Sequence, residues 1–335
     1  MKAAVLSDIH ANGAALKAVL KHAQSKGADQ IWLLGDLIGY ASHPQGCIQT
    51  ISQFYSKDRL RWVAGNHERI FQDVLSACAY GEKITLDSTK TSQELYVAVK
   101  QNLELLHLPQ PSESALLSMI LNIRSMNGFM QTPEAAWYFD EIKTRLEANR
   151  LDFELGGRHW VLAHGSLLRV DEYVHPWSPD SVIFNAMFRE QSLLASGPFC
   201  VCYGHTHIPV LLNISDDKKI QIIDFKYGDP IKLGSLGSII NPGSVGLPSD
   251  YDPRSSYAMI DINNESDHGE ATITFYRLEY EVGKIIRRMG REEYPITLQD
   301  HLNSLEPLPR EGSGNVPKWF EEQCRERKNL PGDTK

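Results

Sequence analysis

Five short apolar stretches of this chain each end at a side chain that can bind a metal ion, and this repeated pattern strongly constrains the fold. The stretches are residues 1–7, 30–34, 60–64, 158–163 and 199–203. In the same order, they lead to Asp8, Asp36, Asn66, His164 and His205. Open α/β sheets place ligands beyond the carboxyl ends of their strands. The pattern therefore predicts an α/β protein in which these side chains meet.

Two pairs of ligand-type residues are spaced two apart, Asp8 with His10 and His205 with His207. In an extended segment such side chains project from the same side, so one strand end can aim two ligands at one place. Taken alone, a strand-end Asp is equally well explained as the cap of the next helix. Taken together and in this order, the residues indicate a metal site.

Helical periodicity appears on both sides of the second and third stretches. Residues 12–26 place their apolar side chains on one face and stop at Gly27, a typical C-terminal stop. Thr132 and Pro133 have the pattern of an N-cap and a first helical position. Residues 70–150 are rich in helical pattern and poor in strand signals, so we expect a helical insertion there.

The second half of the chain returns to strands. Residues 151–154 and 158–163 flank Gly156-Gly157 and predict a hairpin, and two later runs, 256–262 and 271–280, predict two more strands before a helix at 282–289. We expect one domain over residues 1–290 that contains the insertion. The C-terminal tail, 291–335, is charged and contains prolines, so it is either flexible or packed on the domain.

Composition indicates a globular protein without a membrane-spanning segment. The hydrophobic fraction of 42% and the charged fraction of 23% are ordinary for a globular protein. No apolar stretch reaches membrane-spanning length and the first residues already read as a strand, which predicts a cytoplasmic protein without membrane partners. The five cysteines have no framework spacing, and Cys200 and Cys202 fit reduced strand residues. A net charge of −8 argues against sequence-nonspecific nucleic-acid binding.

The ordered motifs resemble those of the calcineurin-like metallophosphoesterase superfamily. They are Asp8-x-His10, Gly35-Asp36, Gly65-Asn66-His67-Glu68, His164-Gly165-Ser166 and Gly204-His205-Thr206-His207. The segments Gly35–Tyr40 and Asn241–Gly246 are similar to the small bacterial and archaeal phosphodiesterase branch. The resemblance implies a four-layer α/β/β/α sandwich of two mixed β-sheets with a helical insertion near the mouth of the active site.

The resemblance also implies two metal ions that share one ligand. The first ion is held by Asp8, His10, Asp36 and His207, and the second by Asp36, Asn66, His164 and His205. Nitrogen and oxygen ligands of this kind suit Mn, Fe, Co, Ni or Zn. Two such ions clamp the phosphoryl oxygens and supply a bridging hydroxide for in-line attack.

His67 follows Asn66 and is assigned by resemblance to the leaving group, whose oxygen it stabilises or protonates. The alternative is a histidine that only supports the metal ligands. Asn12, Arg169 and Arg254 are candidate contacts for the substrate phosphate. For Asn12, capping of the helix that follows it is an equal alternative.

The implied function is hydrolysis of a phosphodiester, and hydrolysis of a phosphomonoester is the next expected activity. A phosphoprotein or nucleotide phosphatase of the same superfamily is the main alternative. A non-catalytic scaffold is disfavoured because every ligand and His67 are intact, and a nuclease is disfavoured by the acidic charge balance. The expected partner is a small phosphorylated substrate. The sequence leaves open whether the chain forms a homo-oligomer.

Overall fold

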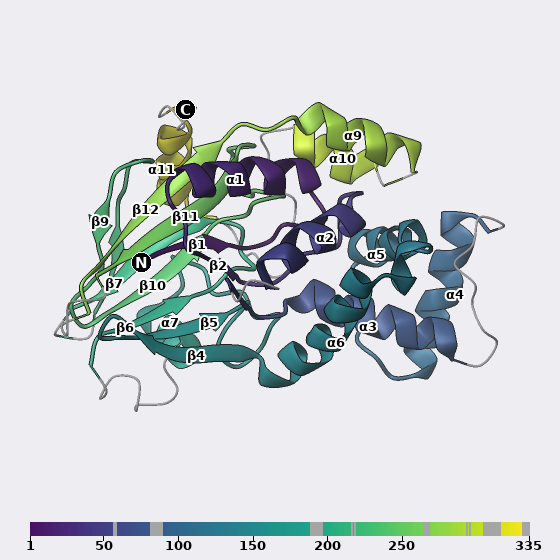
Figure 1. Ribbon diagram of the computed structural model, residues 1–335, viewed down its shortest axis with the longest axis horizontal. Helices are drawn as coiled ribbons and strands as arrows, with labels where there is room; N and C mark the ends of the chain where they lie inside the picture. The colour runs from purple at the N-terminus through teal and green to yellow at the C-terminus, as the bar shows by residue number, and fades with distance from the viewer. Residues whose placement is uncertain are drawn as a thin grey trace.

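The computed structural model contains two mixed sheets of six strands each (Figure 1). It describes residues 1–55, 59–80, 90–187, 197–215, 217, 219–263, 269–292, 294, 296–303 and 316–329. The strand order in the first sheet is β3 (Leu60–Trp62), β2 (Gln30–Leu33), β1 (Lys2–Leu6), β11 (Ser255–Ile262), β12 (Ala271–Leu278) and β9 (Ile231–Lys232). In the second it is β4 (Arg150–Leu155), β5 (Arg158–Ala163), β6 (Phe199–Cys202), β10 (Gly237–Pro242), β7 (Pro209–Ile214) and β8 (Ile220–Ile223).

The strands that lead to the predicted ligands are parallel neighbours. In the first sheet β1 pairs with β2 and β2 with β3, each in parallel. In the second sheet β5 pairs in parallel with β6, and β6 with β10. Parallel neighbours end at the same edge of a sheet, which is why residues distant in sequence converge there.

Strand β1 shows how the layers form. Its side chains alternate between faces, so Ala3 and Val5 pack between the two sheets, whereas Ala4 and Leu6 face the helices outside. Helices α1 (Gly13–Ser25) and α2 (Pro44–Tyr55) contribute to that outer cluster, and α7 (Asp180–Met187) packs on the outer face of the second sheet. The four-layer α/β/β/α sandwich expected from the sequence is confirmed.

The predicted helical insertion consists of helices that gather at one end of the sandwich (Figure 1, right). They are α3 (Asn66–Ala79), α4 (Ser92–Leu105), α5 (Glu113–Ser125), the 3-10 turn Phe129–Gln131 and α6 (Pro133–Ala148). Thr132 caps α6 with Pro133 at its start, as predicted. Because α3 begins at Asn66, the insertion is joined directly to a predicted metal ligand.

The described parts of the C-terminal tail pack on the domain. Helices α9 (Val282–Arg291) and α10 (Ile296–Asn303) share an apolar cluster, and α11 (Lys318–Lys328) buries Phe320 and Cys324 against Ile208. The boundary at residue 290 stays a prediction. Cys200 and Cys202 are buried, unpaired residues of β6. Across the described ranges, no helix combines the length and the apolar character needed to cross a membrane.

Candidate metal centre

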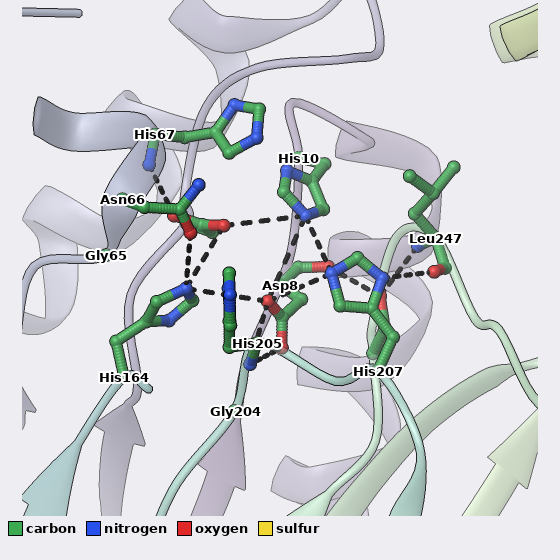
Figure 2. A network of polar contacts seen from close by, with 12 residues as sticks. Asp8, His10, Gly65, Asn66, His67, His164, Gly204, His205, His207 and Leu247 are labelled. Atoms are coloured by element: carbon green, nitrogen blue, oxygen red, sulfur yellow. Dashed lines mark hydrogen bonds and ion pairs between the residues drawn. The ribbon is translucent and has the colours of Figure 1, made fainter. Parts of the chain in front are cut away.

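The predicted ligands lie together beyond the ends of the strands, and all of them except Asp36 are labelled in Figure 2. Asp8 comes just after β1, and His164 follows β5 directly. Asn66 is the first residue of α3. All seven predicted ligands thus lie where the two sheets present the carboxyl ends of their parallel strands. The geometry brings the whole predicted set together.

The backbone at these positions differs from the extended conformation expected for the two spaced pairs. Five of the predicted ligands have positive φ angles of 48° to 65°, namely Asp8, His10, Asp36, His205 and His207. The expectation of extended pairs was wrong, because each pair lies in a tight turn beyond its strand. Left-handed backbone costs on the order of 1–3 kcal/mol per non-glycine residue and concentrates at functional sites. Hydrogen bonds such as His10 N–H to the Asp36 carbonyl, at 2.9 Å, hold these turns.

One group of side chains consists of Asp8, His10 and His207. The His207 Nε2 atom lies 3.1 Å from Asp8 Oδ1 and 3.0 Å from His10 Nε2. On the other side of its ring, His207 Nδ1 lies 2.5 Å from the Leu247 carbonyl oxygen. A carbonyl only accepts, so Nδ1 carries the proton and the Nε2 lone pair points into the centre.

A second group consists of Asp36, His164 and His205, with Asn66 beside it. The His164 Nε2 atom lies 3.2 Å from Asp36 Oδ2 and 3.0 Å from Asn66 Oδ1. His164 is oriented as His207 is, because its Nδ1 lies 2.6 Å from the Leu34 carbonyl oxygen. Asp36 Oδ2 is also 3.7 Å from His10 Nε2, so this carboxylate lies between the two groups.

The donor set could hold metal ions. Within each group the nitrogen and oxygen atoms lie within 4.8 Å of one another, and every member is buried. The Nε2 atoms of His164 and His207 each face a carboxylate oxygen, so an Nε2 atom without a proton could share a metal ion with that oxygen. Among the described residues, the buried His10 Nδ1 has no hydrogen-bond partner, so the protein leaves the orientation of that ring less constrained.

Electrostatics favour a cation at the same place. Burial would raise the pKa of Asp36, but the charges of His164 and His67 outweigh it and hold that pKa well below its usual range. Burial disfavours the charged form of His164, yet Asp36 and Asp8 raise its pKa to about 9. Without an ion, a buried imidazolium therefore balances the carboxylates. Metal binding would release its proton.

His67 lies beside both groups. Its ring centroid is 4.7 Å from that of His10 and 4.5 Å from that of Tyr40, and its backbone N–H donates to Asp36 Oδ1 at 2.8 Å. Burial is the main cause that lowers its pKa to about 4, so the imidazole is neutral at pH 7. His67 also forms a cation-competent group with His10 and Asp36, which sequence reasoning did not anticipate.

Glu68 is a residue whose role sequence reasoning missed. Its buried carboxylate accepts hydrogen bonds from the backbone N–H groups of Asp36, Leu37 and Gly65, at 2.8, 2.9 and 2.7 Å. A fourth comes from the Tyr138 hydroxyl on α6, at 2.8 Å. Glu68 therefore fixes two ligand loops and ties them to the insertion. Its place three residues after Gly65, as in a capping box, was the available signal.

Asn12 caps α1, as one of its two predicted roles required. Its Oδ1 accepts from the Ala15 N–H at 3.1 Å, and its amide nitrogen donates to the Gly246 carbonyl at 3.0 Å and lies 3.1 Å from the Tyr280 hydroxyl. These contacts engage both ends of the side-chain amide. A contact between Asn12 and substrate stays a prediction.

The two candidate arginines are both engaged by aspartates. Arg254 lies 2.7 Å from an Asp252 oxygen, and its side chain is mostly buried. Arg169 makes two hydrogen bonds of 3.0 Å to Asp171 and is exposed at the surface. Only Arg169 of these two lines the cavity beside the centre.

That cavity has a volume of about 750 Å³ and lies between the centre and the insertion. Asn66, His67 and His205 form its inner wall. Two aromatic residues beside them were not predicted: Tyr40, and Tyr173, whose ring centroid lies 4.0 Å from that of His205. Tyr40 ends the Gly35–Tyr40 segment that carries the family resemblance, whereas Tyr173 belongs to no motif of the sequence.

A sequence model of the calcineurin-like phosphoesterase superfamily domain matches residues 1–265. The chain belongs to this family. An uncharacterised protein of Methanocaldococcus jannaschii is similar, with 26% identity over 302 residues that cover 89% of this chain and 96% of that protein. Membership in the family and the His/Asp groups together support a metal-dependent phosphoesterase.

Two solved structures of bacterial and archaeal origin share the fold. A metallophosphoesterase from Sphaerobacter thermophilus matches with a TM-score of 0.56 and 23% identity, over 91% of this chain and 99% of that chain. A hypothetical protein from Pyrococcus horikoshii matches with a TM-score of 0.55 and 16% identity, over 90% of this chain and 97% of that chain. The superfamily predicted from the motifs is confirmed.

Proposed function

We propose that this calcineurin-like phosphoesterase hydrolyses phosphodiesters of small organic molecules with two divalent metal ions. Its proposed ligands are Asp8, His10, Asp36 and His207 for one ion, and Asp36, Asn66, His164 and His205 for the other. One observation carries the proposal: Asn66 and His205, which belong to the second set, line the cavity together with His67, whose ring packs against His10 of the first set. A phosphoryl group bound in the cavity would therefore contact ligands of the second ion and lie close to the first set.

Bound there, two divalent ions would polarise the phosphoryl oxygens and lower the pKa of a bound water. The imidazole and carboxylate donors make Mn, Fe, Co, Ni or Zn the expected ions. The chain itself supplies orientation, since the Leu34 and Leu247 carbonyls fix two imidazole rings and Glu68 fixes the backbone of Asp36. Pre-organised groups of this kind need no rearrangement during the reaction.

His67 is proposed to stabilise the leaving oxygen. Because its imidazole is neutral at pH 7, we expect its N–H to donate a hydrogen bond to the leaving oxygen rather than to transfer a proton from an imidazolium. Such a donor matters most when the leaving alcohol is weakly acidic, because more charge then develops on its oxygen. Removal of one pre-organised donor typically lowers a rate by about 10²–10³-fold.

The size of the cavity supports a small substrate. Its volume of about 750 Å³ falls within the roughly 300–1,000 Å³ typical of small-molecule sites. The apolar wall contributed by Ile70, Leu146 and Leu168 would contact the organic part of such a substrate.

The His67→Ala variant tests this function. With metal-loaded enzyme, we expect a loss of about 10²–10³-fold on a diester with an alkyl alcohol as leaving group, and a much smaller loss on the matching 4-nitrophenyl diester. Metal content, measured on the same samples, should equal that of the wild type.

His159→Ala is the matched control, because His159 lies on β5 away from the centre and pairs with Glu154. It should retain wild-type rates on both esters. Equal losses on both esters in His67→Ala would contradict the leaving-group role. Absence of hydrolysis by the metal-loaded wild type, over phosphodiesters, phosphomonoesters and nucleotides, would contradict the proposed function itself.

A further inference from the structure

The cavity beside the metal centre has two cationic side chains among its described lining residues, Arg69 and Arg169, and they differ in their partners. Arg169 is held by Asp171 through two hydrogen bonds. Arg69 is exposed, and its side chain has neither a hydrogen bond nor an ion pair with any described residue. Its guanidinium therefore retains its full donor capacity for a ligand in the cavity. Its charge does act on Asp73, four residues along α3, where it opposes the rise in pKa that burial causes.

The position of Arg69 relates it to the reacting centre. It lies on α3, three residues after Asn66, and residues three apart share one face of a helix. Arg69 and the predicted metal ligand Asn66 both line the cavity. A group bound by Arg69 would thus lie beside a phosphoryl group at the metal centre, about one helical turn away.

Three other polar side chains of the cavity are already engaged within the protein. Ser112 caps α5, Asn149 donates to the Leu167 carbonyl, and Gln110 donates to the Leu108 carbonyl. They leave Arg69 as the charged donor best placed to recognise a substrate. A guanidinium recognises a carboxylate or a phosphate through paired hydrogen bonds.

We propose that Arg69 binds a second anionic group on the organic part of the substrate. The substrate class is therefore a phosphoester that carries a carboxylate or a further phosphate group, and Arg69 determines that specificity. This inference rests on the proposed function, because it names the substrate of the same site. Asp73, four residues further along α3, also lines the cavity and opposes anion binding.

The test uses methyl phosphodiesters of a nitrophenol that carries a carboxylate, a phosphonate or a neutral amide on its ring. The quantity compared is kcat/KM for an anionic probe divided by kcat/KM for the amide probe. This preference is then divided by the same preference measured for the wild type. Differences in intrinsic reactivity among the probes cancel in that quotient. In Arg69→Ala we expect it to fall about tenfold, the loss of one hydrogen bond to a charged group.

Further variants sharpen the result. Arg69→Lys should retain part of the preference, since the charge remains without the paired donors. Asp73→Asn should increase the preference about twofold to threefold, because it removes a neighbouring negative charge. Arg287→Ala, an exposed arginine on α9 that does not line the cavity, should leave the ratio as in the wild type.

Each outcome has a distinct meaning. If the preference for the phosphonate probe falls more in Arg69→Ala than the preference for the carboxylate probe, Arg69 recognises a phosphate. If the preference for the carboxylate probe falls more, Arg69 recognises a carboxylate. Hydrolysis of all probes with an unchanged ratio in Arg69→Ala overturns this inference and leaves the proposed function standing. Hydrolysis of none of them by the metal-loaded wild type overturns the proposed function, and this inference with it.

Discussion

Two clusters of buried carboxylates in this protein are balanced in different ways. At the centre of the candidate site, Asp8 and Asp36 face imidazoles, whose charge depends on a proton. In the second cluster Asp250 and Asp252 face Arg277, which is permanently charged and completely buried. The second cluster is balanced by a permanent cation, whereas the first holds its charge balance through protons that a metal ion can replace.

The Arg277 cluster, consisting of Arg277, Asp250 and Asp252, has the contacts of a structural element. Arg277 also donates to the Arg254 carbonyl at 2.7 Å and to the Tyr227 hydroxyl at 3.1 Å. Burial would raise the pKa of Asp252, but Arg277 and Arg254 lower it below its usual range. Asp250 is paired less completely, since burial raises its pKa and its Oδ1 atom has no hydrogen-bond partner among the described residues. The cations that face this cluster cannot give up a proton in favour of a metal ion, because a guanidinium stays charged. The comparison therefore separates a structural role from a metal-binding one.

The largest effect is expected for Arg277→Met, which leaves the buried Asp250 without its cation and leaves Asp252 with Arg254 alone. Removal of one partner from a buried ion pair typically costs about 3–5 kcal/mol. We expect a loss of this size in the free energy of unfolding, measured by urea denaturation, both with and without metal ions.

Arg145→Met is the matched control for this variant. Arg145 forms a partly exposed pair with Glu141 on α6, and such helical pairs contribute about 0.3–0.5 kcal/mol. A loss below 1 kcal/mol in Arg277→Met would show that the comparison between the two clusters is wrong.

Metal removal should have the next largest effect on the free energy of unfolding. This effect should come from the candidate centre and not from the Arg277 cluster. Ligand binding to the native state stabilises it by about 2.7 kcal/mol when one site is held at 100 times its Kd. We expect a chelator to lower the free energy of unfolding by an amount of this order for wild type. The Arg277→Met variant should show the same difference between its metal-loaded and metal-free forms.

The contribution of the candidate centre to the free energy of unfolding should change with pH in opposite directions in the metal-free and metal-loaded protein. In the metal-free protein, the raised pKa of His164, about 9, contributes stability below pH 6.5 that is lost as the pH rises to 9. In the metal-loaded protein, protons compete less for the ligands as the pH rises. The stabilisation by metal should therefore grow between pH 6.5 and 9, and a constant difference would contradict this account.

The smallest effect is expected for Tyr138→Phe, which removes one of the four hydrogen bonds to Glu68. Three backbone donors remain, so we expect a loss of about 1 kcal/mol in the free energy of unfolding. Tyr96→Phe on α4 is the control and should be nearly neutral. A loss as large as that of Arg277→Met would mean that Glu68 depends on Tyr138 far more than its backbone contacts indicate.

The convergence of the predicted metal ligands could be foreseen from sequence because strand periodicity is local and parallel strands end at a common edge. The left-handed backbone at Asp8 and His205 could not, since it is held by hydrogen bonds between loops distant in sequence. The Tyr138–Glu68 contact joins residues 70 positions apart, and no pattern in the sequence pairs the two.

The arginines show a further limit of sequence reasoning. Arg254 lies beside Asp252 in the sequence, but only the turn geometry shows that the two side chains pair. Arg69 follows a recognised motif directly, and only the cavity shows that it lines the substrate site. The strand β7 and the helix α2 were also missed, although Val210, Leu211 and Leu212 form an apolar run within β7.

The most direct test of the account is the metal content of the wild type and of Asp36→Asn, measured by mass spectrometry after loading with Mn²⁺ and removal of free ions. Asp36 lies between the two groups of ligands, so its carboxylate is expected to serve both ions. The account predicts two ions per wild-type chain and a loss at both positions in Asp36→Asn. Full occupancy of both positions in the variant, or fewer than two ions in the wild type, would contradict it.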